Sequence, residues 1–202
     1  MLHIITPAYR FENLEKIYNS ILINDDIIWH ISKSNKREEL NFDFIKKDKR
    51  IKIYNVNCED NEIYKKRNAV FEKIKDGYFC LLDDDTIFHE NMYMKYRECI
   101  DQLFIGMLVG EQLNHVGKLR LPASRPIFCK IDTGNVLSHT NCLEQCKWPE
   151  THTHKVNQKD FLFWESVYHF YDKQCTLIHQ PISYYNKLKP IKQWQEKKQH
   201  LL

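Results

Sequence analysis

The chain has 202 residues, of which 43% are hydrophobic, and this suits one domain, or one domain with a tail, built on a sizeable core. Its 30 Lys and Arg residues and 27 Asp and Glu residues give a net charge of +3. That balance argues against a dedicated nucleic-acid-binding protein, which carries a strong basic excess.

The first half of the chain alternates short apolar runs with amphipathic segments. Strands are predicted at residues 2–5, 27–31, 51–56 and 78–82, and helices at residues 10–23 and 61–75. Pro7 interrupts the first strand because it has no N–H, residues 32–37 form a predicted polar loop, and Gly77 ends the second helix. This alternation predicts βαβ units, and hence an α/β fold with a mostly parallel central sheet flanked by helices.

The fourth predicted strand runs directly into three carboxylates, Asp83, Asp84 and Asp85. In open α/β sheets, ligands bind at this carboxyl edge of the strands. Adjacent negative charges repel one another, and no partner for them lies nearby in the sequence. A hard divalent cation shared with substrate phosphates would stabilise them. The alternative is a solvated acidic turn.

The second half of the chain is less regular. A helix is predicted at residues 92–103, strands at 104–109, 127–131 and 175–178, a loop or hairpin at 110–123, irregular chain at 138–158, and a helix starting at Asp160. We expect residues 1–186 to form a single catalytic domain. Residues 187–202 are polar and Lys-rich, and we expect a tail or a linker there.

Four separated pieces of the sequence occur in a fixed order between residue 2 and about residue 185. They are Ile4-Ile5-Thr6-Pro7-Ala8-Tyr9, then Lys66-Arg67-Asn68-Ala69 followed by Phe79-Cys80-Leu81-Leu82-Asp83-Asp84-Asp85, then Asp132-Thr133-Gly134-Asn135, and Lys159-Asp160-Phe161-Leu162-Phe163-Trp164. Together they resemble the inverting, Asp-x-Asp type of nucleotide-sugar glycosyltransferase with a GT-A fold. The first two pieces also resemble the β-1,3-glucuronyltransferases.

This resemblance implies a set of donor-binding and metal-binding residues. The nucleotide-sugar site would comprise Thr6, Pro7, Ala8, Tyr9, Ser32, Arg67, Asp83, Asp84, Gly134 and Asn135, and the metal site Asp83, Asp85 and His179. Asp85 would bind the metal directly, and Asp83 would contact ribose or metal-bound water. Carboxylate, water and phosphate oxygens suit Mn²⁺ or Mg²⁺. Arg67 could instead be a surface charge on its helix, His179 a structural histidine, and Tyr9 a packing residue.

An inverting transfer also needs a general base that takes the proton of the acceptor hydroxyl. The resemblance points to Asp160. Its alternative role is to cap the helix that it is predicted to start, because Asp is favoured at that position. The family usually has Glu before this Asp, whereas this chain has Lys159, which leaves Glu165 as a rival base.

The expected function is metal-dependent transfer of a sugar from a nucleotide-sugar donor, with UDP expected as the nucleotide, to a hydroxyl of a glycan or glycoconjugate. Two alternatives stay open: a sugar-1-phosphate nucleotidyltransferase and a non-catalytic nucleotide-sugar-binding module. The chain lacks a Gly-x-Gly-x-x-Gly motif after its first strand and a Walker-type Gly-Lys-Thr. We expect no nucleic-acid partner.

The first residues lack the basic and long apolar regions of a signal peptide, and no apolar run approaches a membrane span. Seven cysteines without disulfide-like spacing fit free thiols, so we expect a cytoplasmic protein. The residues His139, Cys142, Cys146, His152 and His154 do not have the spacing of a zinc finger, and we expect them to line an acceptor loop.

Overall fold

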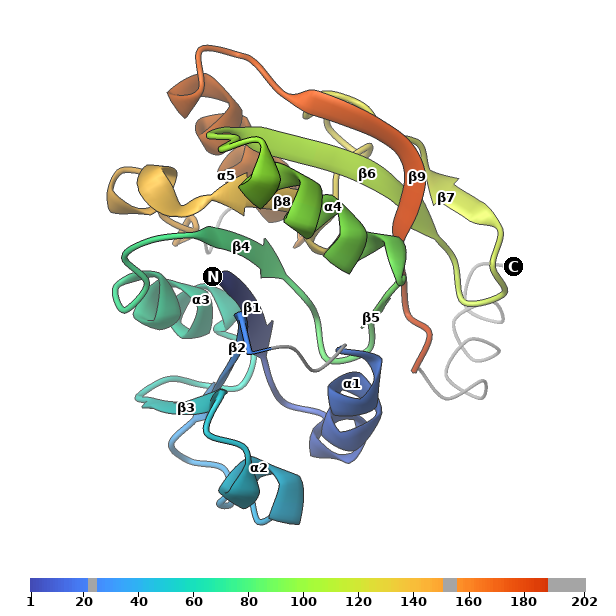
Figure 1. Cartoon of the computed structure of the whole chain (residues 1–202). Helices are drawn as coiled ribbons and strands as arrows, with labels where there is room; N and C mark the ends of the chain where they lie inside the picture. Colours follow the sequence, from blue (N-terminus) through green and yellow to red (C-terminus); the bar gives the residue numbers. More distant parts are fainter. Residues whose placement is uncertain (22–24, 151–155, 189–202) are drawn as a thin grey trace, which may run out of the picture.

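The computed structural model describes residues 1–21, 25–150 and 156–188, which form one curled sheet with helices on both faces (Figure 1). Its strands are β1 (Leu2–Pro7), β2 (Ile27–Ser34), β3 (Ile51–Val56), β4 (Tyr78–Leu81), β5 (Ile87–Phe88), β6 (Met107–Leu113), β7 (Leu119–Leu121), β8 (Val136–His139) and β9 (Thr176–Tyr184). Its helices are α1 (Leu14–Ser20), α2 (Asp43–Lys47), α3 (Ile63–Phe71), α4 (Asn91–Asp101) and α5 (Val156–Phe170). Short 3₁₀ turns are η1 (Phe11–Asn13), η2 (Thr133–Asn135) and η3 (Thr140–Glu144).

The sheet has a parallel half and a mixed half. Its order is β3-β2-β1-β4-β8-β6-β9-β5, with β7 paired to β6. Strands β3, β2, β1 and β4 run parallel, as the βαβ pattern predicts, and β8 is antiparallel to both β4 and β6. Strand β9 is parallel to β6 and antiparallel to β5. The predicted α/β fold with a central sheet flanked by helices is confirmed.

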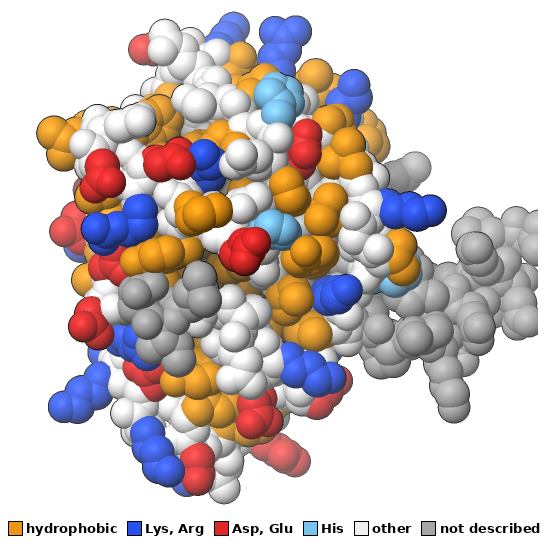
Figure 2. Space-filling view, turned by 45° about the vertical axis from the view of Figure 1, so that its right-hand side comes forward, with side chains coloured by type: hydrophobic (Ala, Val, Ile, Leu, Met, Phe, Trp, Pro, Cys, Tyr) orange, Lys and Arg blue, Asp and Glu red, His pale blue; other side chains and the backbone are white. Residues whose placement is uncertain are grey.

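Acidic and basic side chains are interspersed on the face of the molecule that Figure 2 shows. This agrees with the small net charge of the whole chain. Within the described residues, we find no helix with both the length and the apolar character needed to cross a bilayer.

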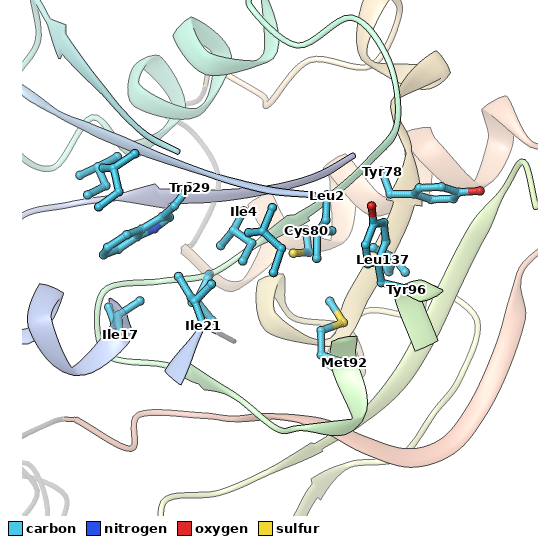
Figure 3. Close-up of a cluster of buried hydrophobic side chains, with 14 of the residues drawn as sticks. Leu2, Ile4, Ile17, Ile21, Trp29, Tyr78, Cys80, Met92, Tyr96 and Leu137 are labelled. Carbon is cyan, nitrogen blue, oxygen red and sulfur yellow. The ribbon is translucent and has the colours of Figure 1, made fainter. Parts of the chain in front are cut away.

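The two faces of the sheet carry separate hydrophobic cores. On one face, residues of α1 and α4 such as Ile17 and Tyr96 pack against Ile4, Trp29 and Cys80 of the strands (Figure 3). On the other face, α3 and α5 cover the alternate residues of β4, Phe79 and Leu81. Because β4 is covered on both sides, its continuous apolar sequence follows from its place in the sheet.

Several predicted elements differ from the observed ones. Residues 127–131 are not a strand, because Lys130 N–H bonds to Ile127 O in a turn and Cys129 has a φ of 65°. Residues 32–34 belong to β2 rather than to a loop. The strand predicted at 104–109 is β6, which lies at residues 107–113 and forms a hairpin with β7.

The helix predicted from Asp160 begins four residues earlier, at Val156. The sequence reading missed α2, β5 and β8, which are short or lie within polar stretches. The helix predicted at 10–23 consists of η1 and α1 and ends at Ser20. Residues 22–23, His152, His154 and most of the predicted tail lie outside the described residues.

The strand that leads to the acidic turn depends on a glycine at its entrance. Gly77 has a φ of +91°, and a Cβ there would lie 2.3 Å from Met1 O; Gly117 has a φ of +83° with nothing within 4 Å. We predict that Gly117→Ala lowers the free energy of unfolding by about 1 kcal/mol through backbone strain. Gly77→Ala should cost at least twice as much, because the backbone oxygen must also move. Urea unfolding of both variants measures this, and equal losses would contradict it.

Candidate active site

The acidic turn lies beside the turn that follows β1. Strands β1 and β4 are parallel neighbours, with Ile5 opposite Leu81, and Leu82 N–H extends the ladder to Ile5 O. The chain therefore leaves both strands at the same edge of the sheet. This places the segment 8–10 against the segment 83–85, which are more than 70 residues apart in the sequence.

Asp84 is the anchor between the two turns. Its side chain is 1% exposed and accepts hydrogen bonds from Tyr9 N (2.8 Å), Arg10 N (2.7 Å) and Arg10 Nη1 (2.6 Å). Asn13 Nδ2 also donates to the Asp84 backbone oxygen at 2.8 Å. Burial raises the pKa of Asp84 to about 6, although the two backbone N–H groups and Arg10 oppose the shift. Asp84 thus serves the architecture of the site.

Two arginines compensate the charge of the acidic turn. Arg10 Nη1 lies 3.0 Å from Asp85 Oδ2 in addition to its contact with Asp84. Arg67 Nη2, from α3, lies 2.6 Å from Asp83 Oδ1, and Thr133 Oγ1 donates to Asp83 Oδ2 at 3.1 Å. No partner for the three carboxylates lies nearby in the sequence, and the structure supplies Arg10 and Arg67 from distant parts of the chain. The alternative of Arg67 as a surface charge is wrong, since its side chain is 4% exposed.

A pocket of about 420 Å³ opens beside Asp83, and its volume lies within the range typical of small-molecule sites. Its lining residues are Tyr9, Asp60, Asn61, Ile63, Tyr64, Arg67, Asp83, Trp148, Lys159 and Asp160. Three of these, Tyr9, Arg67 and Asp83, were expected at the donor site, and Asp160 was expected as the general base. The structure brings the four together from the turn after β1, from α3, from the turn after β4 and from α5.

Three consecutive residues of α3 bond to different segments around the pocket. Lys66 Nζ, fully buried, donates to Ala8 O at 3.3 Å and to Asp60 O at 3.0 Å. Arg67 reaches the acidic turn, and Asn68 hydrogen bonds to the backbone of Trp148. Because neighbouring residues on a helix point about 100° apart, each side chain serves a different segment.

Asp160 differs from the other carboxylates of the pocket. Asp60 and Asp83 both accept hydrogen bonds, whereas Asp160 accepts none from the described residues. Arg67 Nη1 lies 3.8 Å from Asp160 Oδ1, close enough for an ion pair and too far for a hydrogen bond. Burial, followed by repulsion from Asp132, raises the pKa of Asp160, while Arg67 opposes the shift. Asp160 lies within α5, so its alternative role as a helix cap is wrong.

The remaining predicted residues do not line this pocket. Thr6 Oγ1 accepts from Trp29 Nε1 at 3.0 Å, Ala8 is buried, and Pro7 closes β1. Ser32 is fully buried, and its hydroxyl has no hydrogen-bond partner within the described residues. Glu165 lies five residues beyond Asp160 on α5, so it points about 140° away around the helix axis.

Gly134 and Asn135 belong to the buried turn η2. A Cβ on Gly134 would lie 3.0 Å from Gln112 Nε2, and Asn135 Oδ1 accepts from Asp132 N at 3.0 Å in a capping box. His139, Cys142 and Cys146 gather around η3. His152 and His154, which were expected to line the same acceptor loop, lie outside the described residues.

The three predicted metal ligands do not all lie together in the structure. Asp83 has a side chain that is 34% exposed toward the pocket, whereas the side chain of Asp85 is 7% exposed and pairs with Arg10. His179 is placed elsewhere on β9, with its ring 3.9 Å from Glu111. No group of three His, Cys, Asp or Glu side chains in the described residues could hold a metal ion. A cation bound at Asp83 would therefore take most of its ligands from donor phosphates and water, as Mg²⁺ commonly does.

Sequence reasoning missed several pocket residues, and one signal could have found two of them. Asp60 and Asn61 follow β3, so they lie at the same carboxyl edge as the acidic turn. Trp148 gave no such signal, because it belongs to a stretch without periodicity.

Comparisons with known proteins extend the fold assignment. No protein-family model and no curated protein matches this sequence. The structure of S. aureus TarS 1-349 matches with a TM-score of 0.70 at 14% identity, over 91% of this chain and 59% of that chain. Its complex with UDP-GlcNAc matches with a TM-score of 0.68 at 15% identity, over 91% and 57%. This chain thus spans about three fifths of the TarS 1-349 chain and 36% of the chain in another S. aureus TarS structure.

A second kind of protein shares the fold. The 4-diphosphocytidyl-2C-methyl-D-erythritol synthase from Anaerococcus prevotii matches with a TM-score of 0.58 at 12% identity, over 99% of this chain and 95% of that chain. At these identities the likenesses concern the fold, and they confirm a GT-A-like arrangement.

The role of Arg10 can be tested by stability. We predict that Arg10→Met lowers the free energy of unfolding by about 3 kcal/mol at pH 8, because it leaves buried Asp84 without its cation. The folded-state pKa of Asp84 lies above its unfolded value of 3.8, so its stabilising contribution is lost as the pH rises through about 6. Without Arg10 the pKa of Asp84 should rise further, so Asp84 is mostly protonated and uncharged at pH 5. Arg10→Met should therefore lower the free energy of unfolding less at pH 5 than at pH 8.

The matched control is Arg97→Met, which breaks a more exposed ion pair with Asp26 and should cost less than about 1 kcal/mol at either pH. Urea unfolding at the two pH values measures both variants. Equal costs for Arg10→Met at pH 5 and pH 8 would contradict the assignment of Asp84.

Proposed function

We propose that this protein is a glycosyltransferase that moves a sugar from a nucleotide-sugar donor, with UDP as the nucleotide, to a hydroxyl of a glycan or glycoconjugate with inversion. The observation that carries the proposal is the position of Asp160. It is the pocket carboxylate that accepts no hydrogen bond from the described residues, and it lies across Arg67 from Asp83. The GT-A-like fold, shared with a protein solved with UDP and UDP-GlcNAc, supports it.

The proposed reaction uses the two sides of the pocket differently. Asp160 takes the proton of the acceptor hydroxyl while the oxygen of that hydroxyl forms a bond to the anomeric carbon of the donor. On the opposite side of that carbon, the bond to the diphosphate oxygen breaks, and the nucleoside diphosphate leaves with the electron pair. Arg67 and Lys159 both line the pocket, and they are the cationic residues that would stabilise the negative charge on the diphosphate. A displacement with attack and departure on opposite faces inverts the anomeric centre.

We also propose that Mn²⁺ or Mg²⁺ takes part and is bound through Asp83 together with donor phosphate oxygens, with Asp85 as a further candidate ligand. Such a cation would supply charge stabilisation for the leaving diphosphate. Two guanidinium groups already accompany the acidic turn, so loss of the metal should weaken donor binding without destabilising the fold.

A second candidate function is nucleotidyl transfer to a sugar 1-phosphate. The Anaerococcus synthase matches this chain over almost the full length of both chains, and this match supports nucleotidyl transfer as the second candidate. The two reactions give different products from a UDP-sugar: glycosyl transfer or donor hydrolysis releases UDP, whereas reversal of nucleotidyl transfer by pyrophosphate releases UTP.

The assignment of the base predicts a sharp difference between two acidic residues of α5. Asp160→Asn should lower turnover, measured as UDP release, at least 100-fold, because an amide cannot take the acceptor proton. Its affinity for UDP should stay within about threefold of wild type. Glu165→Gln, the matched control outside the pocket, should keep turnover within twofold. If Glu165→Gln loses turnover and Asp160→Asn does not, the base has been misassigned.

Donor binding can be tested without turnover. We predict that UDP and UDP-sugars raise the melting temperature by several degrees with Mn²⁺, since a ligand at a hundred times its Kd adds about 2.7 kcal/mol. The shift should be smaller with EDTA and in Asp83→Asn. Mn²⁺ alone serves as the control. No shift with any nucleotide or nucleotide sugar in the presence of Mn²⁺ would contradict the proposed function.

A further inference from the structure

Trp148 lines the pocket of the candidate site, although nothing in the sequence marked it as functional. It is 2% exposed, and the guanidinium carbon of Arg67 lies 3.9 Å from the centroid of its ring. Phe163 packs against the indole with ring centroids 4.6 Å apart. A guanidinium stacked on a desolvated indole gains attraction from the ring and has a defined plane.

The backbone of Trp148 is fixed by the residue that follows Arg67. Asn68 Oδ1 accepts from Trp148 N at 2.8 Å, and Asn68 Nδ2 donates to Trp148 O at 3.0 Å. One amide thus hydrogen bonds to both the N–H and the C=O of Trp148. Adjacent residues of α3 therefore hold the backbone and the ring of the same tryptophan, which links α3 firmly to the segment that precedes α5.

The ring is important because Arg67 is held at few other points. Its Nε is buried and has no hydrogen-bond partner within the described residues. Its Nη2 bonds to Asp83 at 2.6 Å, and its Nη1 stays 3.8 Å from Asp160. A small rotation of the guanidinium would bring Nη1 into hydrogen-bond distance of Asp160. Such a bond would occupy a lone pair of the carboxylate and make it a weaker proton acceptor.

We propose that Trp148 is a positioning residue, whose indole holds the Arg67 guanidinium on Asp83 and away from a hydrogen bond to Asp160, so that Asp160 stays available as the proton acceptor. The inference rests on the proposed glycosyl transfer and adds to it a device that sets the base. It also accounts for the two contacts of the Trp148 indole, which packs against Phe163 in the core and against the Arg67 guanidinium.

The test is a double-mutant cycle between Trp148 and Arg67, read out as turnover of a UDP-sugar and as affinity for UDP. Trp148→Leu should lower kcat about tenfold, the kinetic equivalent of one cation–π contact, and should change the KM for the donor less than threefold. Trp148→Phe keeps an aromatic face and should recover most of the activity. In an Arg67→Ala background, Trp148→Leu should cost less than twofold further, because it acts through Arg67.

Trp164 provides the matched control, since it is fully buried and stacks on Phe79 with ring centroids 5.9 Å apart. Trp164→Leu should lower the melting temperature, leave kcat of the folded protein within twofold, and combine additively with Arg67→Ala. All rates are measured well below the melting temperature of the weakest variant, so that loss of folded protein does not count as loss of turnover.

Two results would overturn the proposal: full additivity of Trp148→Leu with Arg67→Ala, or equal losses in Trp148→Leu and Trp148→Phe. The same cycle measured by urea unfolding reports the contact itself without any activity. If wild type binds no nucleotide and transfers no sugar, the proposed function fails and this role of Trp148 fails with it. If wild type is active and the cycle is additive, only the role of Trp148 fails.

Discussion

The site depends on pairing guanidinium groups with the carboxylates of the acidic turn. Three adjacent aspartates at the end of a buried strand would repel one another, and burial would make their charge costly. Arg10 compensates Asp84 and Asp85 from the turn after β1, and Arg67 compensates Asp83 from α3. Since these contacts join segments distant in sequence, the parallel pairing of β1 with β4 has to form for the turn to be stable. The charges of the acidic turn are therefore compensated only when the fold brings these segments together.

The carboxylates in and beside the pocket differ in their hydrogen bonds and in their exposure. Asp84, with three donors to its side chain, joins two turns and has no surface left for a ligand. Asp83 is held by Arg67 and Thr133 but remains one-third exposed. Asp160 has an ion pair without a hydrogen bond, and its raised pKa suits a group that takes a proton. Asp84 is thus a structural carboxylate, whereas Asp83 and Asp160 keep exposed surface at the pocket, and these are the two to which we propose a role toward the substrate.

The sequence pattern predicted the parallel half of the sheet well, because buried strands and amphipathic helices leave distinct periodicities. The resemblance to GT-A glycosyltransferases implied that Tyr9, Arg67, Asp83 and Asp160 belong to one site, and all four line the same pocket. The sequence pattern could not reveal that Arg10 pairs with Asp84, or that Arg67 stacks on Trp148, because both contacts depend on tertiary packing. Ser32, Gly134 and Asn135 were expected to face the donor, but packing places them in the interior. The strand predicted at 127–131 failed because an apolar run of that length also fits a turn packed on the surface.

A crystal structure of the protein with a UDP-sugar and Mn²⁺ would test the proposed site directly. We predict that the diphosphate lies against Arg67 and Asp83, with the anomeric carbon facing the side of the pocket that carries Asp160. We also predict that the Arg67 guanidinium remains stacked on Trp148. A donor bound away from this pocket, or oriented with its anomeric carbon turned away from Asp160, would contradict the proposed site.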